Sequence, residues 1–537
     1  MNKYLQIIVL SFFMPLVAGS QTWQWAEKVN SINNNIYAGS IDVDKDGNSY
    51  ITGDFYNSAS FGSTTITTPG LVSAFIAKYD INGNLLWAKA AGSGSDVEVY
   101  GICVDKSGNI SLTGIFKGTS TFGSRKLTSV GDFDVFVSHY NSDGDIQWAQ
   151  SAGDTGFDYA GSISHDAIGN VYVTGDFHIS AFSGSSSKIF VAKYDSTGAN
   201  VWLKKPTEYS DFHLGDCIKT DSAGNSYFTG QFFDGLTFDS SIILNTGNKE
   251  DNAYIGKMNT DGKVLWLQEA GAATGYMGAN GIDIDKAGNA YITGFYRGTV
   301  SFGSLSLTGP AGLYYSMFIA KCNTSGEYIW VNKSTGPAGS SNGSAVSVDN
   351  AGNCYFGGSF SVPITLDSTT LTNSGYTDVF VTKIDSLGNF IWATNCGSPY
   401  STTIKGIKAN SKSVFLSGNF LGDINFGSHI SLSADTTIRS LYTAKLTDTT
   451  LTASVPNTNY PHYSVFPNPV TNYIQLNGIA GNEHYIIYDV HGRQIMQGDL
   501  NNANKISVVN LQSGIYFIDV FNKSNPERTD KIKFIKN

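Results

Sequence analysis

The sequence has little cysteine and no clustered metal ligands. Among 537 residues there are five cysteines, at Cys103, Cys217, Cys322, Cys354 and Cys396. They form no CxxC pair and no Cys/His spacing of the kind that zinc or redox sites need. We therefore expect the five cysteines to be small buried residues that fill positions of a repeat. A cysteine pair brought together between neighbouring repeats is the alternative.

Other signals of chemistry are also missing. The chain contains no HExxH motif, no phosphate-binding glycine loop and no Ser-His-Asp signature. It has no basic run, and its formal net charge is −10, which argues against a nucleic-acid partner. Beyond residue 20 no apolar stretch is long enough to span a membrane as a helix. We therefore expect no cofactor and no transmembrane segment.

The first 20 residues have the pattern of a secretory signal peptide. Lys3 precedes an apolar stretch over residues 5–17, and Ala18, Gly19 and Ser20 form a small-residue cleavage site. No cysteine follows this site, so a lipoprotein anchor is not expected. The segment predicts export across the inner membrane.

A repeat of 55 to 64 residues occupies most of the chain. Its marker is a glycine after the second expected strand, at Gly53, Gly114, Gly175, Gly230, Gly294, Gly358 and Gly418. Each copy holds alternating segments rich in β-branched and aromatic residues, separated by Asp-x-x-Gly-Asn and Asp-x-x-Gly turns. This pattern predicts about four antiparallel strands per copy. Such a unit buries both faces only against its neighbours.

The last strand of six copies carries a tryptophan, and the corresponding strand of the seventh copy is found at the other end of the chain. Six copies end on Trp87, Trp148, Trp202, Trp266, Trp330 and Trp392, whereas the seventh has none. The missing strand stands at the N-terminus around Trp25. A strand moved from one end of an array to the other removes an exposed edge when a ring closes. Residues 21–446 are therefore expected to form a seven-bladed β-propeller closed by the N-terminal strand.

The first strand of each copy is expected to be the innermost. The residue before its Ile or Val is always small: Ser40, Gly101, Ser162, Cys217, Gly281, Ala345 and Gly406. Blades converge at a propeller axis, where large side chains would collide.

A separate unit follows the repeats. Residues 447–462 are rich in Thr, Pro and Asn and have the composition of a linker. Residues 463–537 contain short alternating strands and predict a small immunoglobulin-like β-sandwich. The whole chain is therefore expected to be all-β.

Several tail motifs resemble a known export signal. They are Pro467-Asn468-Pro469, the turn from Tyr488 through Gly492 to Arg493, the segment Leu511 to Tyr516, and the lysine-rich end. Their order resembles the type A C-terminal sorting domain of the type IX secretion system of Bacteroidetes. The resemblance implies the type IX machinery as a partner, followed by cleavage and release or attachment to the outer-membrane surface. The repeats are similar to the bacterial β-propeller repeats called SBBP, which carry no agreed activity.

One turn has the opening of a calcium loop. Asp42, Asp44, Asp46 and Gly47 follow the D-x-D-x-D-G spacing, but the twelfth position is Gly53 rather than a bidentate glutamate. An aspartate that caps a turn and a glycine that accepts positive φ explain every copy together. Calcium binding stays as the alternative.

The loops divide into two faces. The first and third turns of each copy are short and repetitive, whereas the second loop and the crossover to the next copy are long and divergent. Divergent loops on a repeat scaffold favour binding sites. Crossover residues include Asp216 and Tyr276, and the selected candidate binding residues are Asp96, Glu98, Tyr100, Asp158, Tyr159, Tyr209, Asp211 and His213.

Carboxylates beside aromatic residues suit a sugar or peptide ligand. We expect a secreted or surface-attached, monomeric binding or adhesion module for a glycan or surface protein, without catalytic residues. The alternative is a secreted carbohydrate-active enzyme, a glycosidase or lyase, that uses acids on the long-loop face. A passive surface-layer component is a third reading.

Overall fold

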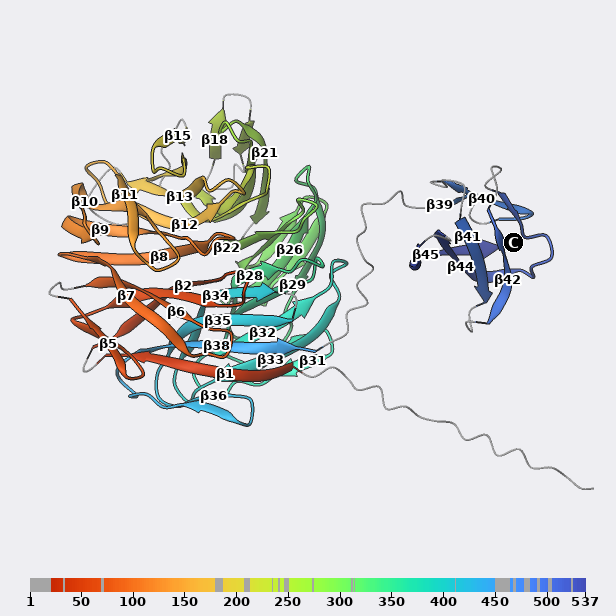
Figure 1. Ribbon diagram of the computed structural model, residues 1–537. Helices are drawn as coiled ribbons and strands as arrows, with labels where there is room; N and C mark the ends of the chain where they lie inside the picture. Colours follow the sequence, from red (N-terminus) through yellow and green to blue (C-terminus); the bar gives the residue numbers. More distant parts are fainter. Residues whose placement is uncertain are drawn as a thin grey trace, which may run out of the picture. The chain divides into compact units, whose positions relative to one another are not determined.

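The computed structural model describes residues 21–31, 34–68, 72–178, 187–206, 213–233, 235–239, 242–245, 251–272, 275–310, 312, 314–410, 412–449, 464–466, 470–477, 483–489, 493–500, 505–522 and 525–537. The signal segment, most of the linker, and Pro467 to Pro469 lie outside them. The chain divides into two compact units, residues 1–452 and 453–537. Within the described ranges all regular secondary structure is strand (Figure 1).

The larger unit consists of repeated four-stranded antiparallel arrangements, called here sheets 1 to 7 in chain order. Their first strands are β2 (Ile36–Val43), β8 (Asp96–Val104), β12 (Tyr159–His165), β16 (Leu214–Thr220), β22 (Tyr276–Ile284), β28 (Ser341–Val348) and β34 (Thr402–Asn410). Their second strands are β3 (Ser49–Phe55), β9 (Ile110–Phe122), β13 (Val171–His178), β17 (Ser226–Phe233), β23 (Ala290–Arg297), β29 (Cys354–Phe360) and β35 (Ser413–Phe420). Their third strands are β6 (Ser73–Tyr79), β10 (Arg125–Tyr140), β14 (Ser187–Tyr194), β20 (Asp251–Met258), β26 (Ser316–Cys322), β32 (Asp378–Ile384) and β38 (Ser440–Asp448). Their fourth strands are β7 (Leu85–Ser93), β11 (Ile146–Ala152), β15 (Asn200–Lys204), β21 (Val264–Ala272), β27 (Tyr328–Lys333), β33 (Phe390–Gly397) and β1 (Gln21–Asn30).

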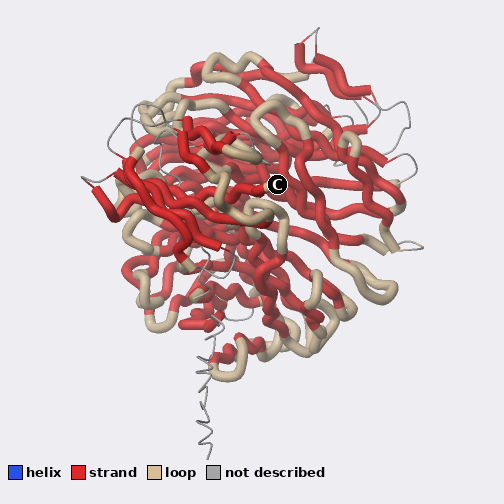
Figure 2. Tube along the Cα trace, turned by 90° about the vertical axis from the view of Figure 1, so that its right-hand side faces the viewer, coloured by secondary structure: helices blue, strands red, loops and turns tan. Residues whose placement is uncertain are grey.

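Short hairpins extend five of the second-to-third strand connections. They are β4 (Ser58–Phe61) with β5 (Thr64–Thr67), β18 (Gly235–Asp239) with β19 (Ile242–Asn245), β24 (Thr299–Phe302) with β25 (Leu305–Thr308), β30 (Ile364–Leu366) with β31 (Thr369–Leu371), and β36 (Ile424–Phe426) with β37 (Ile430–Leu432). In sheet 2 the same connection is a longer hairpin made by β9 and β10 themselves. Figure 2 shows that strands connected by loops and turns make up the described part of the chain.

The first strands form a closed ring. Each contacts the first strand of the next sheet, from β2 to β8 and onward to β34, and β34 contacts β2 again. The small residues lie where these strands approach. A Cβ on Gly406 would press on Ile41 of β2, and one on Gly281 would meet Ala345 of β28. Small side chains are needed here because neighbouring backbones leave no room for larger ones.

The N-terminal strand completes sheet 7. β1 pairs antiparallel with β38 from Gln21 opposite Asp448 to Val29 opposite Leu441. The indole Nε1 of Trp25 donates to the Ile81 carbonyl of sheet 1 at 3.1 Å. The regular repeats make the same kind of contact. For example, the indole Nε1 of Trp148 in sheet 2 donates to the Ser196 carbonyl of sheet 3, also at 3.1 Å. The displaced strand therefore makes the contact between sheets that the regular repeats make.

A β-bulge interrupts every first strand at the same place, next to the small residue. The recurrent glycine of the second strand lies opposite. A Cβ on Gly175 would overlap the carbonyl oxygen of Tyr159, and one on Gly114 would overlap that of Glu98. The glycine that marks the repeat thus permits the bulge. A bulge leaves an extra residue outside the ladder and redirects its side chain.

The smaller unit contains two antiparallel sheets. One has the order β39 (Ser464–Phe466), β40 (Tyr473–Asn477), β43 (Lys505–Ser507), and the other β42 (Gln494–Asp499), β41 (Glu483–Asp489), β44 (Gly514–Asn522), β45 (Asn525–Lys536). Ile474 of the first sheet and Ile487 and Ile518 of the second belong to one buried apolar cluster. The two sheets therefore share a core of their own.

Candidate ligand-binding cavity

A cavity of about 1080 Å³ lies inside the ring of first strands. Each sheet contributes the residue at its bulge, immediately before the small residue. These are Gly39, Tyr100, Gly161, Asp216, Asn280, Ser344 and Lys405. The scaffold is repetitive, but this position carries an aromatic, an acid, a base, an amide and a hydroxyl. The bulge therefore presents a different chemical group from almost every sheet to one space.

Aromatic residues form one wall of the cavity. The rings of Tyr100 and Tyr159 stack with centroids 5.5 Å apart and planes 13° apart, and Phe157, which is outside the cavity lining, packs 5.3 Å from Tyr159. The Tyr100 hydroxyl donates to Glu98 Oε2 at 2.6 Å, and Tyr159 is 39% exposed. A fixed, partly exposed aromatic face suits an apolar sugar face or another planar group. Three of the residues selected from the sequence, Glu98, Tyr100 and Tyr159, thus meet here.

Acidic residues from sheets 1, 3 and 4 form a second wall. Burial raises the pKa of Asp54 well above its usual range, although its Oδ1 accepts from the Val99 amide at 2.7 Å. Burial and the nearby Asp176 raise the pKa of Asp216 to about 7. Burial also raises the pKa of Asp176, partly offset by His178, whose Nε2 lies 2.6 Å from Asp176 Oδ2. These carboxyl groups retain protons more readily than exposed ones, so they can both donate and accept.

Basic residues of sheet 7 line the cavity as well. They are Lys405 at the bulge of β34 and Arg439 just before β38. The Arg439 guanidinium lies 5.3 Å from the centre of the Tyr37 ring. Burial and the neighbouring arginine lower the pKa of Lys405. The cavity is therefore electrostatically asymmetric around the ring.

The remaining selected residues have other positions. Asp158 is buried, accepts from the Asp154 amide at 2.8 Å, and has its pKa raised by burial to about 7. Asp96 begins β8 opposite Lys117 and is outside the cavity lining. His213 is buried with Nε2 3.0 Å from the Gly235 carbonyl, and burial lowers its pKa to about 4. Tyr209 and Asp211 lie outside the described residues.

Sequence reasoning did not select Asp176, His178, Lys405 or Arg439. Two positional signals were available. Asp176 and Asp54 directly follow the recurrent glycine, and Lys405 directly precedes the small residue of the axis. A position that varies chemically between two constant positions of a repeat marks a side chain that the scaffold does not require. Nothing local marks Arg439.

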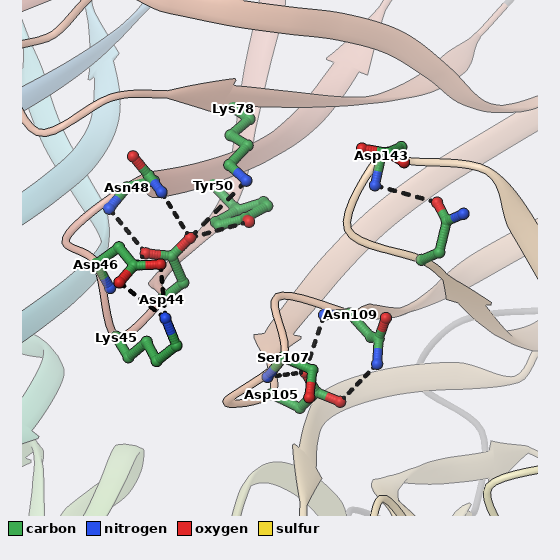
Figure 3. A network of polar contacts seen from close by, with 11 residues as sticks. Asp44, Lys45, Asp46, Asn48, Tyr50, Lys78, Asp105, Ser107, Asn109 and Asp143 are labelled. Atoms are coloured by element: carbon green, nitrogen blue, oxygen red, sulfur yellow. Dashed lines mark hydrogen bonds and ion pairs between the residues drawn. The ribbon is translucent and has the colours of Figure 1, made fainter.

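The turn with the calcium-like spacing uses its carboxylate internally (Figure 3). Asp44 Oδ1 accepts from the Asp46 and Asn48 amides at 2.9 Å, and its Oδ2 accepts from Asn48 Nδ2 at 2.8 Å and the Tyr50 hydroxyl at 3.1 Å. Asp105 makes the corresponding bonds to Ser107 and Asn109. The described part of the chain holds no cluster of three or more metal-ligating side chains. These contacts support the turn interpretation of the motif.

The five cysteines are free thiols, four of them buried and Cys217 half-buried. Burial raises the pKa of Cys103 well above its usual range, and it does the same for Cys354. A raised pKa keeps a thiol protonated and unreactive at neutral pH.

The tail matches a known family. Residues 464–536 match the family described as "Secretion system C-terminal sorting domain". This match indicates export by the type IX secretion system and a secreted or cell-surface protein, with the secretion machinery as a partner of the tail. Among the residues that the structure describes, there is no helix able to cross a membrane.

Similar proteins exist for the larger part of the chain. An uncharacterized WD repeat-containing protein of Acanthamoeba polyphaga mimivirus is 25% identical over 512 residues, covering 75% of this chain and 36% of that protein. The chain thus spans about a third of the length of that relative. A catalytically inactive virginiamycin B lyase from Staphylococcus aureus with quinupristin is 12% identical, with a TM-score of 0.43, covering 79% of this chain and 99% of that one. A protein of unknown function from Dyadobacter fermentans is 9% identical, with a TM-score of 0.40, covering 80% and 99%.

Proposed function

We propose that residues 21–446 are a closed seven-bladed β-propeller of the SBBP type. The support is the cyclic contact of the first strands and the pairing of β1 with β38. Residues 1–20 would be removed as a signal peptide, and residues 447–462 would connect to an immunoglobulin-like sorting domain of the Bacteroidetes type at 463–537. Cleavage in this linker would leave the propeller as the working part.

The propeller's function in this proposal is non-catalytic binding of a glycan on the cell surface or outside the cell. The observation that carries it is the cavity to which the bulges present five chemically different side chains, those of Tyr100, Asp216, Asn280, Ser344 and Lys405. The stacked pair of Tyr100 and Tyr159 supplies a rigid surface for a sugar ring. Fixed side chains on a rigid scaffold bind with little loss of conformational entropy.

A second candidate is hydrolysis or elimination on a polysaccharide. The observation that favours it is the group formed by Asp176, His178 and Asp216 on the cavity wall. A carboxyl group whose pKa lies at about 7 is suited to give or take a proton at neutral pH.

A polysaccharide screen that records both retention and product release separates these functions. Retention without products supports binding, and turnover that Asp216→Asn abolishes establishes the enzyme. Ser344→Trp should place an indole ring inside the cavity, obstruct the ligand and remove retention, because Ser344 lines the cavity. Ser107→Trp in an exposed turn is the matched control and should retain every ligand. Retention that survives Ser344→Trp would contradict the cavity as the binding site.

A further inference from the structure

Two cations in the cavity have no carboxylate partner. Among the described residues, neither Lys405 nor Arg439 forms an ion pair, and their side chains donate no hydrogen bond. Elsewhere in the same ring the cations are paired. Lys408, three residues after Lys405, lies 3.0 Å from Asp42, and Lys219 lies 3.5 Å from Asp283. The missing partner is thus a property of the cavity and not of the inner strands in general.

Asp54, which lines the same cavity, does not take this role. Asp54 acts on Lys405 electrostatically, but its Oδ1 is held by the Val99 amide and burial raises its pKa well above the usual range. Among the described residues, Asp54 forms no ion pair with Lys405 or Arg439. Lys405 is exposed and Arg439 is half-buried on the cavity wall, so an anionic group of a ligand can reach both cations and pair with them.

The arginine is held in place for this contact. Its backbone amide donates to Asn35 Oδ1 at 2.8 Å, and its guanidinium stacks on Tyr37. A planar guanidinium presents parallel N–H donors that match the two oxygens of a carboxylate.

We propose that the cavity binds an acidic oligosaccharide of the uronic acid class, whose carboxylate contacts Lys405 and Arg439. A neighbouring sugar ring lies on the face formed by Tyr159 and Tyr100. The cavity lining also includes the carboxyl group of Glu98, which disfavours ligands with a dense negative charge, so a carboxylated sugar fits better than a heavily sulfated one. This inference rests on the proposed binding function and specifies its ligand.

Calorimetry on the full chain tests it with a short oligogalacturonate and its methyl ester, which keeps the sugar and removes the charge. A neutral manno-oligosaccharide, a sulfated dextran and a glutamate-rich peptide complete the panel. The oligogalacturonate should bind, the methyl ester should bind about tenfold or more weakly, and Arg439→Gln should cause a similar loss. Lys405→Met should also weaken binding.

Arg297→Gln is the matched control, because Arg297 also stacks on a tyrosine, 5.7 Å from the ring of Tyr315, but lies outside the cavity lining. It should leave the affinity unchanged. Equal affinity for the acid and its ester, or preference for the sulfated dextran or the peptide, overturns the inference. Binding of the neutral oligosaccharide alone overturns the inference and leaves the proposed function standing. If none of these ligands binds, the result contradicts both the inference and the proposed binding function.

Discussion

Replacing Lys408 by Met should destabilise the ring at its inner strands. Asp42 Oδ1 lies 3.0 Å from Lys408 Nζ, and its Oδ2 accepts from the Val104 amide at 2.8 Å, so one carboxylate joins sheets 7, 1 and 2. Although burial opposes it, the charges of Lys408 and Lys219 hold the pKa of Asp42 below its usual value. Without Lys408 the buried carboxylate loses its ion-pair partner, and only Lys219, which lies 3.5 Å from Asp283, still acts on it electrostatically. We expect a loss of about 3 kcal/mol, the lower end for such pairs, because Lys408 is 26% exposed.

The expected change in melting temperature is small but measurable. At roughly 2.1 cal/mol/K per residue, a ring of about 430 residues has an unfolding entropy near ~0.9 kcal/mol/K, so the shift is about 3 °C. Differential scanning calorimetry at neutral pH measures it. The loss should shrink in acid, because a depressed carboxyl pKa contributes stability above the unfolded value and loses it as the pH falls.

Two further variants separate charge from packing. Lys412→Met removes an exposed lysine of the same sheet and should change the stability by about 0.5 kcal/mol or less. Adding Asp42→Asn to Lys408→Met should recover more than half of the loss, because the amide oxygen still accepts from Val104. If Lys408→Met behaves like Lys412→Met, or the double variant is no better than the single one, the account of this pair is wrong.

Three other predictions follow from the closure, the tail and the cavity. Deletion of residues 21–28 removes most of β1 and should lower the melting temperature or cause aggregation, and an unchanged melting curve would disprove closure. A chain ending at residue 450 should keep its propeller folded but accumulate in the periplasm of the native host, and normal surface or medium levels on fractionation would refute the sorting role. A raised carboxyl pKa makes the folded state less stable as the pH rises from about 4 to 7. Asp216→Asn should therefore reduce the decrease in unfolding free energy over this range. Equal profiles of stability against pH for the two proteins would contradict the raised pKa.

The repeated parts of the fold were predictable from the sequence because the same strand patterns, turns and glycine recur in each copy. The all-β character is confirmed, and so is the tail as a secretion sorting domain. The reason for the recurrent glycine was not predictable. In the sequence, Gly175 is only a glycine within a strand pattern. The structure shows that the bulge brings the Tyr159 carbonyl so close to Gly175 that a Cβ would not fit. The recurrent glycine and the small residue mark the position of the bulge in each copy, but the sequence alone does not show which backbone atoms meet there.

The cavity was only partly predictable for the same reason. Glu98, Tyr100 and Tyr159 were selected because the sequence assigned them to divergent crossovers, but the structure places Glu98 and Tyr100 in β8 and Tyr159 at the start of β12. His178 ends a second strand and Arg439 lies beside a third, so alternation alone does not show that they face one space. His213 looked functional among acids, but its ring is buried and bonded to a backbone carbonyl.

The most direct test of the account is a crystal structure of the full chain with the tightest-binding saccharide from the screen. The account predicts sugar density inside the ring of first strands, with a ring against Tyr159 and a carboxylate at Lys405 and Arg439. Density on the short-turn face around Asp44 and Asp105, or on the outer fourth strands with the cavity unchanged, would contradict it.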